Sequence, residues 1–342
     1  MRAAVIPQWG TDFELMDVDT PEPGPGEVRV RIGASGACHS DLHVKAGEMG
    51  DLGFTNGRLK ILGHENAGWV DALGDGVSGL EIGEPVAVFG GWGCGRCRFC
   101  LGGDEQLCNT LLWGGMGRPG GYAEQLIVPA ARHLIPLGDL DPVDVAPMTD
   151  AALTPYRAVK KALPRLVPGS TAVVIGAGGL GQFGLQLVKA LSPASLVVVE
   201  TAADKRELAT ALGADLVLDP ANCDAVAEIK AFSGGEGANA VFDFVGVDPT
   251  MAVMASALGR QGLGVLVGLA GGSTPFSFFT LAAEATLTSS NWGNHNELTE
   301  VLALARTGAI TAQVEQYPLE KINDVFDRLA NGEVRGRAVL VP

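Results

Sequence analysis

The sequence feature that most constrains the fold is a glycine motif, Gly-Ala-Gly-Gly-Leu-Gly, at residues 176–181. It directly follows the apolar run 171–175 and opens an apolar stretch of helical character, 180–191. In such a motif the first glycine permits a tight turn, the second lets the backbone approach a pyrophosphate, and the third allows close packing of helix on sheet. The order of strand, turn and helix therefore predicts a dinucleotide site; the alternative is a glycine-rich turn that binds nothing. The residues assigned to this site are Gly176, Gly178, Gly179, Leu180 and Gly181.

The region after Thr154 and Pro155 alternates strands with helices. Its apolar runs lack period-two alternation, which is typical of parallel strands covered on both faces. We therefore expect a doubly wound parallel sheet, a Rossmann domain, over residues 153–290, with helices at 204–212 and 224–232. The expected strands are 172–175, 196–199, 216–218, 241–244, 263–267 and 286–288.

Glu200, at the end of the second of these strands, bears on the choice of cofactor. A carboxylate there can accept hydrogen bonds from the adenosine ribose hydroxyls and would repel a 2′-phosphate, which favours NAD over NADP. Lys205 and Arg206 follow shortly after it and leave NADP open as the alternative. We also assign Lys205, Val245 and Val267 to the cofactor site.

Residues 1–152 show a different pattern, in which short β-like runs are broken by glycine and proline. This pattern predicts an irregular β-barrel. Residues 291–342 are expected to complete the barrel domain with a helix, 296–306, and a last strand, 338–341. The β-like runs include 28–32, 67–70 and 85–89.

Four of the six cysteines are clustered with the spacing C-x2-C-x2-C-x7-C. Four thiolates this close can surround one tetrahedral Zn(II), and a site closed by four protein ligands has no open position, so we expect a structural zinc. The alternatives are an iron–sulfur cluster and a set of free or disulfide-bonded thiols. The four residues are Cys94, Cys97, Cys100 and Cys108.

The charge of the chain excludes whole classes of partner. Its formal net charge is −15 and its pI is about 4.7, and an acidic surface repels nucleic-acid backbones and anionic lipid. No apolar run reaches the roughly 18 residues that span a bilayer. The amino-terminal segment also lacks the apolar core of a signal peptide. We expect no nucleic-acid or membrane partner and a cytoplasmic location.

Three further clusters carry residue types that bind metals: Cys38-His39-Ser40-Asp41-Leu42-His43, Gly63-His64-Glu65 and Met148-Thr149-Asp150. Each is a weak signal alone, because a lone cysteine or histidine is usually structural. With the glycine motif and the four cysteines, their order resembles the zinc-containing medium-chain alcohol dehydrogenases over essentially the whole chain. Among these, the bacterial NAD-dependent secondary-alcohol dehydrogenases look most similar. Further matching runs are 24–28, 92–95, 149–151, 153–156 and 336–339.

The resemblance implies a GroES-like barrel that holds a catalytic zinc through Cys38, His64 and Asp150. Thiolate, imidazole and carboxylate leave a fourth position for water or substrate. Many family members carry cysteine at the position of Asp150. The rival role for Asp150 is to cap a helix that begins near Ala151.

The resemblance also implies a proton relay. Ser40 would accept the hydroxyl proton of an alcohol whose pKa the zinc lowers, and pass it through the nicotinamide ribose to His43, which returns it to solvent. The alternative for His43 is an ordinary surface histidine. Glu65 is a candidate transient ligand, and Asp41 is a candidate acceptor for an imidazole N–H.

The implied activity is reversible hydride transfer between NAD(H) and a primary or secondary alcohol, apolar or aryl, with two zinc ions per chain. The alternatives are a polyol or amino-alcohol dehydrogenase of the same superfamily, a zinc-free quinone-reductase-like enzyme, and a non-enzymatic NAD-binding protein. Retention of Cys38, Ser40, His43 and His64 together disfavours the last two.

The remaining implications concern the cofactor, the substrate and the assembly. Arg337 is implied as a pyrophosphate partner. Segments 46–62 and 110–121 depart from the relatives, so the identity of the substrate cannot be carried over. A homotetramer is expected, in which the strand 263–267 and the run 281–288 extend a sheet across a subunit contact. Candidates for the substrate pocket, each with a place in the core as its alternative, are Trp92, Trp113 and Trp292.

Overall fold

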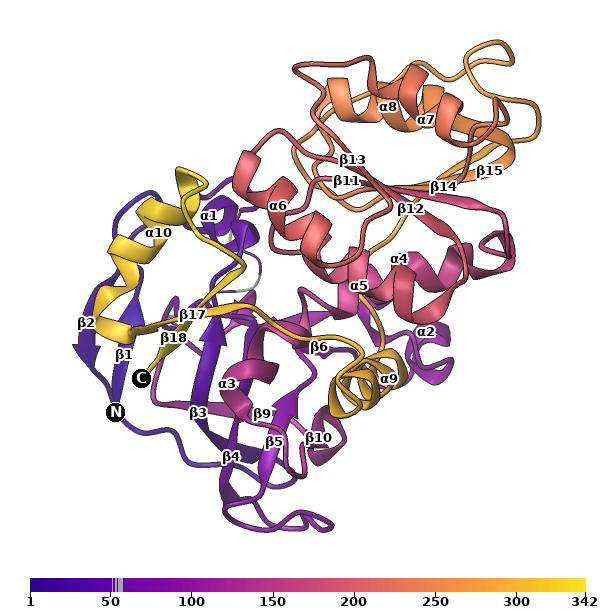
Figure 1. Ribbon diagram of the computed structural model, residues 1–342. Helices are drawn as coiled ribbons and strands as arrows, with labels where there is room; N and C mark the ends of the chain where they lie inside the picture. Colours follow the sequence, from indigo (N-terminus) through magenta and orange to yellow (C-terminus); the bar gives the residue numbers. More distant parts are fainter. Residues whose placement is uncertain (51, 53, 55–57) are drawn as a thin grey trace. The chain divides into compact units, whose positions relative to one another are not determined.

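The computed structural model describes residues 1–50, 52, 54 and 58–342, and its chain forms two compact units (Figure 1). The first, called here the barrel unit, consists of Met1–Ala151, Gly293–Arg306 and Thr311–Pro342. The second, the parallel-sheet unit, consists of Ala152–Trp292 and Thr307–Ile310. None of the helices in the described residues combines the length and the apolar character that crossing a bilayer requires.

The barrel unit is built on a seven-stranded sheet in the order β10-β5-β4-β3-β18-β17, with β9 also paired to β3. All of its pairs are antiparallel except β17 with β18. The strands of the unit are β1 (Arg2–Val5), β2 (Glu14–Asp17), β3 (Val28–Gly36), β4 (Glu65–Leu73), β5 (Pro85–Val88), β6 (Gly91–Trp92), β7 (Leu112–Gly114), β8 (Gly117–Arg118), β9 (Gln125–Val128), β10 (Leu134–Pro136), β17 (Val314–Pro318) and β18 (Arg337–Val341). Its α-helices are α1 (His39–Lys45), α2 (Arg98–Leu101), α3 (Pro142–Val145), α9 (His295–Arg306) and α10 (Ile322–Ala330).

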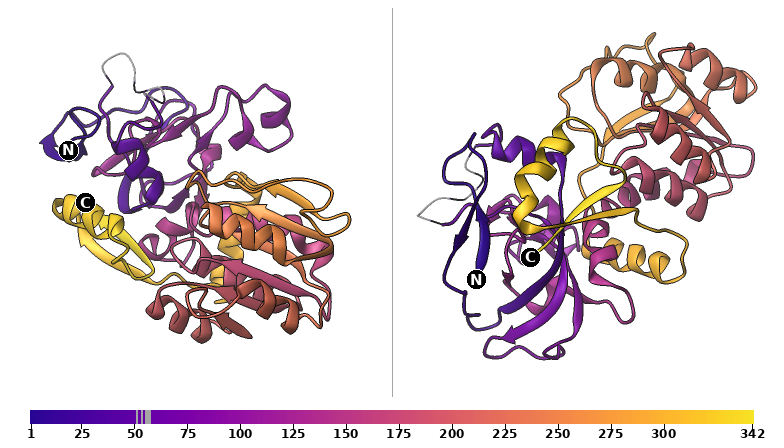
Figure 2. Two further views of the ribbon diagram at one scale, coloured as in Figure 1. Left: turned by 90° about the horizontal axis from the view of Figure 1, so that it is seen from above. Right: turned by 60° about the vertical axis from the view of Figure 1, so that its left-hand side comes forward.

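The two ends of the chain meet in the barrel unit. The ring of Phe13 lies 4.9 Å, centroid to centroid, from that of Phe326 on α10, and Tyr122 packs edge-on against both. Figure 2 shows the first strands beside the carboxyl-terminal helix in both views. Burial of these large rings accounts for much of the local stability, since each fully buried aromatic side chain contributes about 1.5–3 kcal/mol.

The parallel-sheet unit contains a six-stranded sheet, all parallel, in the order β13-β12-β11-β14-β15-β16. This is the strand order of the doubly wound dinucleotide-binding fold. Helices α7 and α8 cover one face, and α4, α5 and α6 lie on the other (Figure 1). The elements are α4 (Leu153–Ala162), β11 (Thr171–Ile175), α5 (Gly181–Leu191), β12 (Ser195–Val199), α6 (Ala203–Ala211), β13 (Leu216–Leu218), α7 (Ala225–Phe232), β14 (Ala238–Asp243), α8 (Asp248–Ala257), β15 (Leu258–Leu266) and β16 (Thr286–Ser289).

The predicted fold class, a GroES-like domain with a Rossmann sheet, is confirmed, and each of the six predicted parallel strands is present. The main difference is β15, which begins at Leu258 instead of residue 263. Leu258 pairs with Ala238 of β14, and the regular pairing resumes at Leu263 opposite Ala240. The residues between, which include Gly259 and Gly262, form an irregularity in the strand and carry no apolar signal. Part of the segment 46–62, which departs from the relatives, lies outside the described residues, namely residues 51, 53 and 55–57.

Candidate active site and metal centres

Four side chains that can ligate a metal converge inside the barrel unit. Cys38 follows β3 and precedes α1, His64 and Glu65 lie at the start of β4, and Asp150 follows a short 3-10 helix, Ala146–Thr149. One ligand atom from each lies within 4.8 Å of the others. Three of the four are buried and Asp150 is partly buried, so strands and helix ends distant in sequence hold one preformed cluster.

The separations of these atoms fit a tetrahedral zinc. With bonds of about 2.0–2.3 Å, nitrogen and oxygen ligands lie about 3.3 Å apart, and sulfur and oxygen ligands about 3.5 Å apart. The distance from His64 Nε2 to Asp150 Oδ2 is 3.3 Å, and that from Cys38 Sγ to Asp150 Oδ2 is 3.8 Å. The helix α4 has Ala152 as its N-cap and no side-chain cap hydrogen bond. The rival role of Asp150 as a helix cap stays the alternative.

Asp41 and Tyr122 orient the imidazole of His64. Asp41 Oδ1 lies 3.2 Å from His64 Nδ1, as the sequence predicted, and Asp41 Oδ2 accepts from the Tyr122 hydroxyl at 2.8 Å and from the Cys38 N–H at 3.2 Å. Burial alone would lower the pKa of His64, but Asp41 and Asp150 raise it well above its ordinary value. Tyr122 was missed by the sequence analysis, because its contact joins residues 81 positions apart and no local pattern marks it.

Glu65 forms a buried ion pair with Arg337, with Oε2 3.0 Å from Nε and a second contact from Oε1 to Nη2. Burial raises the pKa of Glu65 to about 7, although Arg337 acts in the opposite direction. Glu65 is thus paired with an arginine, and its role as a transient ligand stays a prediction. Arg337 is thus placed beside the metal ligands. Its role toward a pyrophosphate stays a prediction.

The two predicted relay residues lie on α1. Ser40 Oγ is 3.6 Å from Cys38 Sγ, so its hydroxyl borders the donor cluster. His43 lies one turn further on with its side chain 41% exposed, and its Nδ1 is 2.6 Å from Glu48 Oε2. Ser40 thus lies beside the donor cluster and His43 lies nearer the solvent on the same helix. Their roles in a proton relay stay predictions.

The other four cysteines gather in a separate lobe. Their sulfur atoms lie within 4.8 Å of one another, with Cys97 Sγ 3.4 Å and Cys94 Sγ 4.0 Å from Cys100 Sγ. Sulfur ligands around one zinc lie about 3.8 Å apart. All the cysteines are free thiols, so the disulfide alternative does not apply to this structure. The fourth member of the set is Cys108.

Glu105 anchors this lobe to the barrel. Its carboxylate accepts the Gly93 N–H at 3.0 Å and lies 3.2 Å from Arg132 Nε and 3.1 Å from His133 Nε2. Burial lowers the pKa of His133 to about 4, although Glu105 acts in the opposite direction. No role was predicted for His133 from the sequence, because a single histidine carries no pattern.

In the parallel-sheet unit the glycine motif follows β11 and leads into α5. Gly176 has φ 85°, a left-handed backbone that favours glycine, and a Cβ there would lie 2.6 Å from Val245 Cγ2. Glu200 follows β12, and its two oxygens accept the N–H groups of Ala177 at 2.7 Å and Ala202 at 2.8 Å. The carboxylate thus ties the motif to the next strand.

The other predicted cofactor residues of this unit are Val267, which directly follows β15, and Lys205, which lies on the helix after Glu200. The Val267 N–H donates to the Asp243 carbonyl at 2.9 Å, next to the strand end that leads to Val245. Lys205 is on α6 and is partly exposed. The predicted cofactor residues of this unit therefore gather at the carboxyl ends of the strands, where doubly wound folds bind their ligands.

The three predicted pocket tryptophans differ in their burial. Trp92 is 4% exposed, its indole N–H donates to the Phe89 carbonyl at 2.9 Å, and it packs among the valines of the seven-stranded sheet. It lies in this apolar cluster, as the alternative to a pocket role expected. Trp113 is partly buried on β7, and Trp292 is buried with φ 45°. The pocket role of all three stays a prediction.

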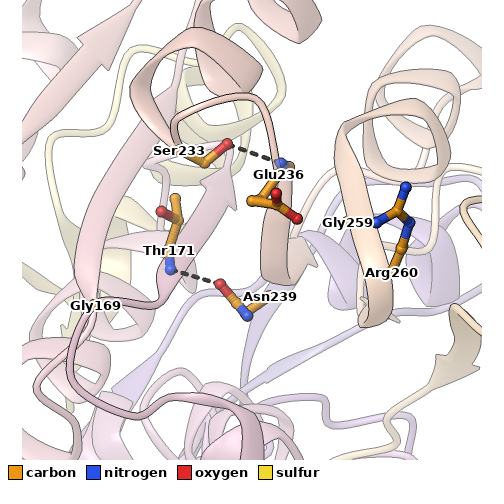
Figure 3. Close-up of a pocket in the computed structure, with 8 residues that line it drawn as sticks. Gly169, Thr171, Ser233, Glu236, Asn239, Gly259 and Arg260 are labelled. Atoms are coloured by element: carbon orange, nitrogen blue, oxygen red, sulfur yellow. Dashed lines mark hydrogen bonds between the residues drawn. The ribbon is translucent and has the colours of Figure 1, made fainter.

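A pocket of about 220 Å³ lies elsewhere in the parallel-sheet unit (Figure 3). It is lined by residues such as Thr171, which begins β11, and Asn239, near the start of β14. It therefore lies at the amino ends of the strands, opposite the glycine motif, and is no part of the predicted cofactor site.

Comparison with known proteins agrees with this arrangement of sites. Residues 24–139 match the alcohol dehydrogenase GroES-like domain, and residues 179–307 match the zinc-binding dehydrogenase family. The chain therefore belongs to the zinc-containing medium-chain alcohol dehydrogenase family, and its two donor clusters are the catalytic and structural zinc sites of that family.

Individual relatives cover the whole chain. An NAD-dependent alcohol dehydrogenase of Sulfurisphaera tokodaii is 37% identical over 350 residues, covering 100% of both chains. A D-arabinose 1-dehydrogenase (NADP(+)) of Saccharolobus solfataricus is 35% identical, covering 100% of this chain and 97% of its own. The crystal structure of an alcohol dehydrogenase from Aeropyrum pernix superposes with a TM-score of 0.92 at 37% identity, with complete coverage of both chains. These relatives are archaeal, and the expected nearness to bacterial secondary-alcohol dehydrogenases stays a prediction.

Proposed function

We propose that this protein is an NAD-linked, zinc-dependent alcohol dehydrogenase that interconverts a primary or secondary alcohol and its aldehyde or ketone. The observation that carries the proposal is the cluster of Cys38, His64, Glu65 and Asp150. In the proposal Cys38, His64 and Asp150 would ligate a catalytic zinc and leave a fourth position for water or substrate. In this proposal, residues 1–152 and 291–342 form the domain that binds the zinc and the substrate, and residues 153–290 form the domain that binds the cofactor.

The residues of the chain have distinct tasks in this reaction. A zinc held by the three donors would lower the pKa of an alcohol hydroxyl. Asp41 fixes the ring of His64 through Nδ1, so that Nε2 faces the metal position. Ser40, beside Cys38, accepts the hydroxyl proton, and His43, further out on α1, releases it to solvent. Arg337 neutralises Glu65 and keeps that carboxylate from competing for the metal.

The proposal of NAD over NADP rests on Glu200. Its carboxylate lies beside the glycine motif and is held by two backbone N–H groups, which keeps a negative charge where a 2′-phosphate would approach. NADP is the competing cofactor, because one of the relatives is an NADP-linked D-arabinose dehydrogenase. Values of kcat/KM for the two cofactors decide it, and a preference for NADP would contradict the assignment of Glu200.

The proposed substrates are apolar or aryl secondary alcohols. A sugar is the second candidate, because the D-arabinose 1-dehydrogenase is as similar in sequence as many of the alcohol dehydrogenases. NADH formation with secondary alcohols, aryl alcohols, polyols and aldoses tests the two. A kcat/KM for arabinose well above that for every simple alcohol would reject the first in favour of the second.

We further propose a homo-oligomer, with a tetramer as the expected state. Leu263 and its neighbours pair on both sides, so β15 cannot extend the sheet as predicted; β16 is the edge strand instead. Phe276, Phe278 and Phe279, in the loop before β16, are 75%, 90% and 92% exposed, which is costly for a lone chain in water. Light scattering measures the mass, and a monomer would contradict the proposal.

A further inference from the structure

The carboxyl-terminal end of α1 folds into a specific cap. The helix ends at Lys45, and the Gly47 N–H donates to the Val44 carbonyl at 2.9 Å while the Glu48 N–H donates to the His43 carbonyl at 3.1 Å. Gly47 has φ 79°, the left-handed conformation that this pair of hydrogen bonds requires. In this Schellman motif the residue after the glycine comes to lie against the third residue from the helix end. Here those two residues are Glu48 and His43.

The cap places a carboxylate on the predicted relay histidine. Glu48 Oε2 lies 2.6 Å from His43 Nδ1, and the two side chains are 62% and 41% exposed. The other charged groups of α1 are engaged elsewhere. Lys45 Nζ lies 2.7 Å from Asp12 Oδ1, and Asp41 is buried. Glu48 is thus the acid that faces His43 at the solvent side of the helix.

A carboxylate at Nδ1 determines how the ring can act. It accepts the Nδ1–H, so the neutral imidazole keeps its lone pair on Nε2. Among the residues that the structure describes, none forms a hydrogen bond with Nε2 of His43. The ring is therefore set to take up a proton at Nε2 and to release one at Nδ1.

We propose that Glu48 is a positioning residue for His43 and the exit of the proton relay, an inference that rests on the proposed function. His43 takes the alcohol-derived proton at Nε2 and becomes an imidazolium paired with the carboxylate. The Nδ1 proton then passes to Glu48 Oε2 and from there to water, which restores both neutral imidazole and carboxylate. One proton enters and one leaves, and no electrons move at either residue.

The test compares Glu48→Gln with the wild-type holoenzyme. The amide retains the size of the side chain but cannot take up the proton. The rate of NADH formation in the first turnover is measured, so that product release does not mask the effect. We expect this rate to fall about 10-fold, the lower end for loss of a group that orients a catalytic histidine, with KM for the alcohol unchanged. Added formate should restore part of the rate in Glu48→Gln.

The matched control is Asp12→Asn, which removes the other exposed ion pair of α1 and should change the rate less than twofold.

A double variant separates a relay role from a structural one. If Glu48 acts through His43, Glu48→Gln should cause no further loss in a His43→Gln background. Equal losses in both backgrounds, or a wild-type rate in Glu48→Gln alone, would overturn the inference. If none of the alcohols and sugars tested supports NAD reduction by the wild-type enzyme, the proposed function is rejected instead. The two failures are therefore distinguishable.

Discussion

Among single residues, Asp150 is the ligand whose assignment most needs testing, because many relatives use cysteine there. Asp150→Asn keeps the volume of the side chain but removes the charge that a zinc ligand supplies. We expect the catalytic zinc to lose occupancy and kcat to fall at least about 100-fold, since metal stabilisation of the reacting oxygen contributes several kcal/mol. Elemental analysis and kcat of the purified variant measure both. An active variant with a full complement of zinc would show that Asp150 is not a ligand.

Some residues of the site can be predicted from the sequence, and others cannot. Cys38, His64 and Asp150 were predicted to be metal ligands through their resemblance to a family, and the structure brings the three together. Tyr122 was not predicted, because a tyrosine that donates to a buried carboxylate looks like any core tyrosine in the sequence. Glu48 was also missed, although Gly47 beside it is a recognisable helix-capping signal.

At the scale of elements, the glycine motif offers a matched pair of substitutions. A Cβ on Gly181 would collide with the Gly176 carbonyl, whereas a Cβ on Gly178 would meet nothing within 4 Å. We therefore expect Gly181→Ala to lower the melting temperature by several degrees, because the turn must deform.

Gly178→Ala should fold normally and bind NAD more weakly, because the added methyl group stands where the backbone approaches the pyrophosphate. Thermal melts and NAD titrations of the two variants measure these effects. If Gly178→Ala binds NAD as the wild type does, the pyrophosphate does not lie on this motif.

The lobe with four cysteines is expected to show a pH dependence through His133. Its pKa is about 4 in the folded protein, because burial disfavours the charged ring, against 6.5 for an ordinary histidine. The unfolded chain therefore binds more protons between these values, and stability falls as pH decreases from about 6.5 to 4.

His133→Gln removes the titrating group and leaves an amide that can reach Glu105. The difference in melting temperature between pH 7 and pH 5 should then be smaller in the variant than in the wild type, with zinc content measured in both. If the melting temperatures of the variant and the wild type change equally between pH 7 and pH 5, His133 is not buried in its neutral form.

For the whole molecule, the sequence predicted the fold class and both metal clusters better than it predicted which side chains lie at the surface. The glycine motif and the cysteine spacing are local patterns, so the chain itself displays them. The place of Trp92 in the core and the edge position of β16 depend on pairings between distant segments, which no local pattern encodes. The loop bearing Phe276, Phe278 and Phe279 is apolar in the sequence, yet only the structure shows that it is exposed.

The central claim is that a catalytic zinc at Cys38, His64 and Asp150 and a separate structural zinc at the four cysteines support NAD-linked alcohol oxidation. The most direct measurement is the zinc content per chain, followed alongside NADH formation during treatment with a chelator. We predict two zinc ions per chain at the start. The one at the open site should leave first together with the activity, and added zinc should restore both. Full activity in protein that holds one zinc ion or none would contradict the account.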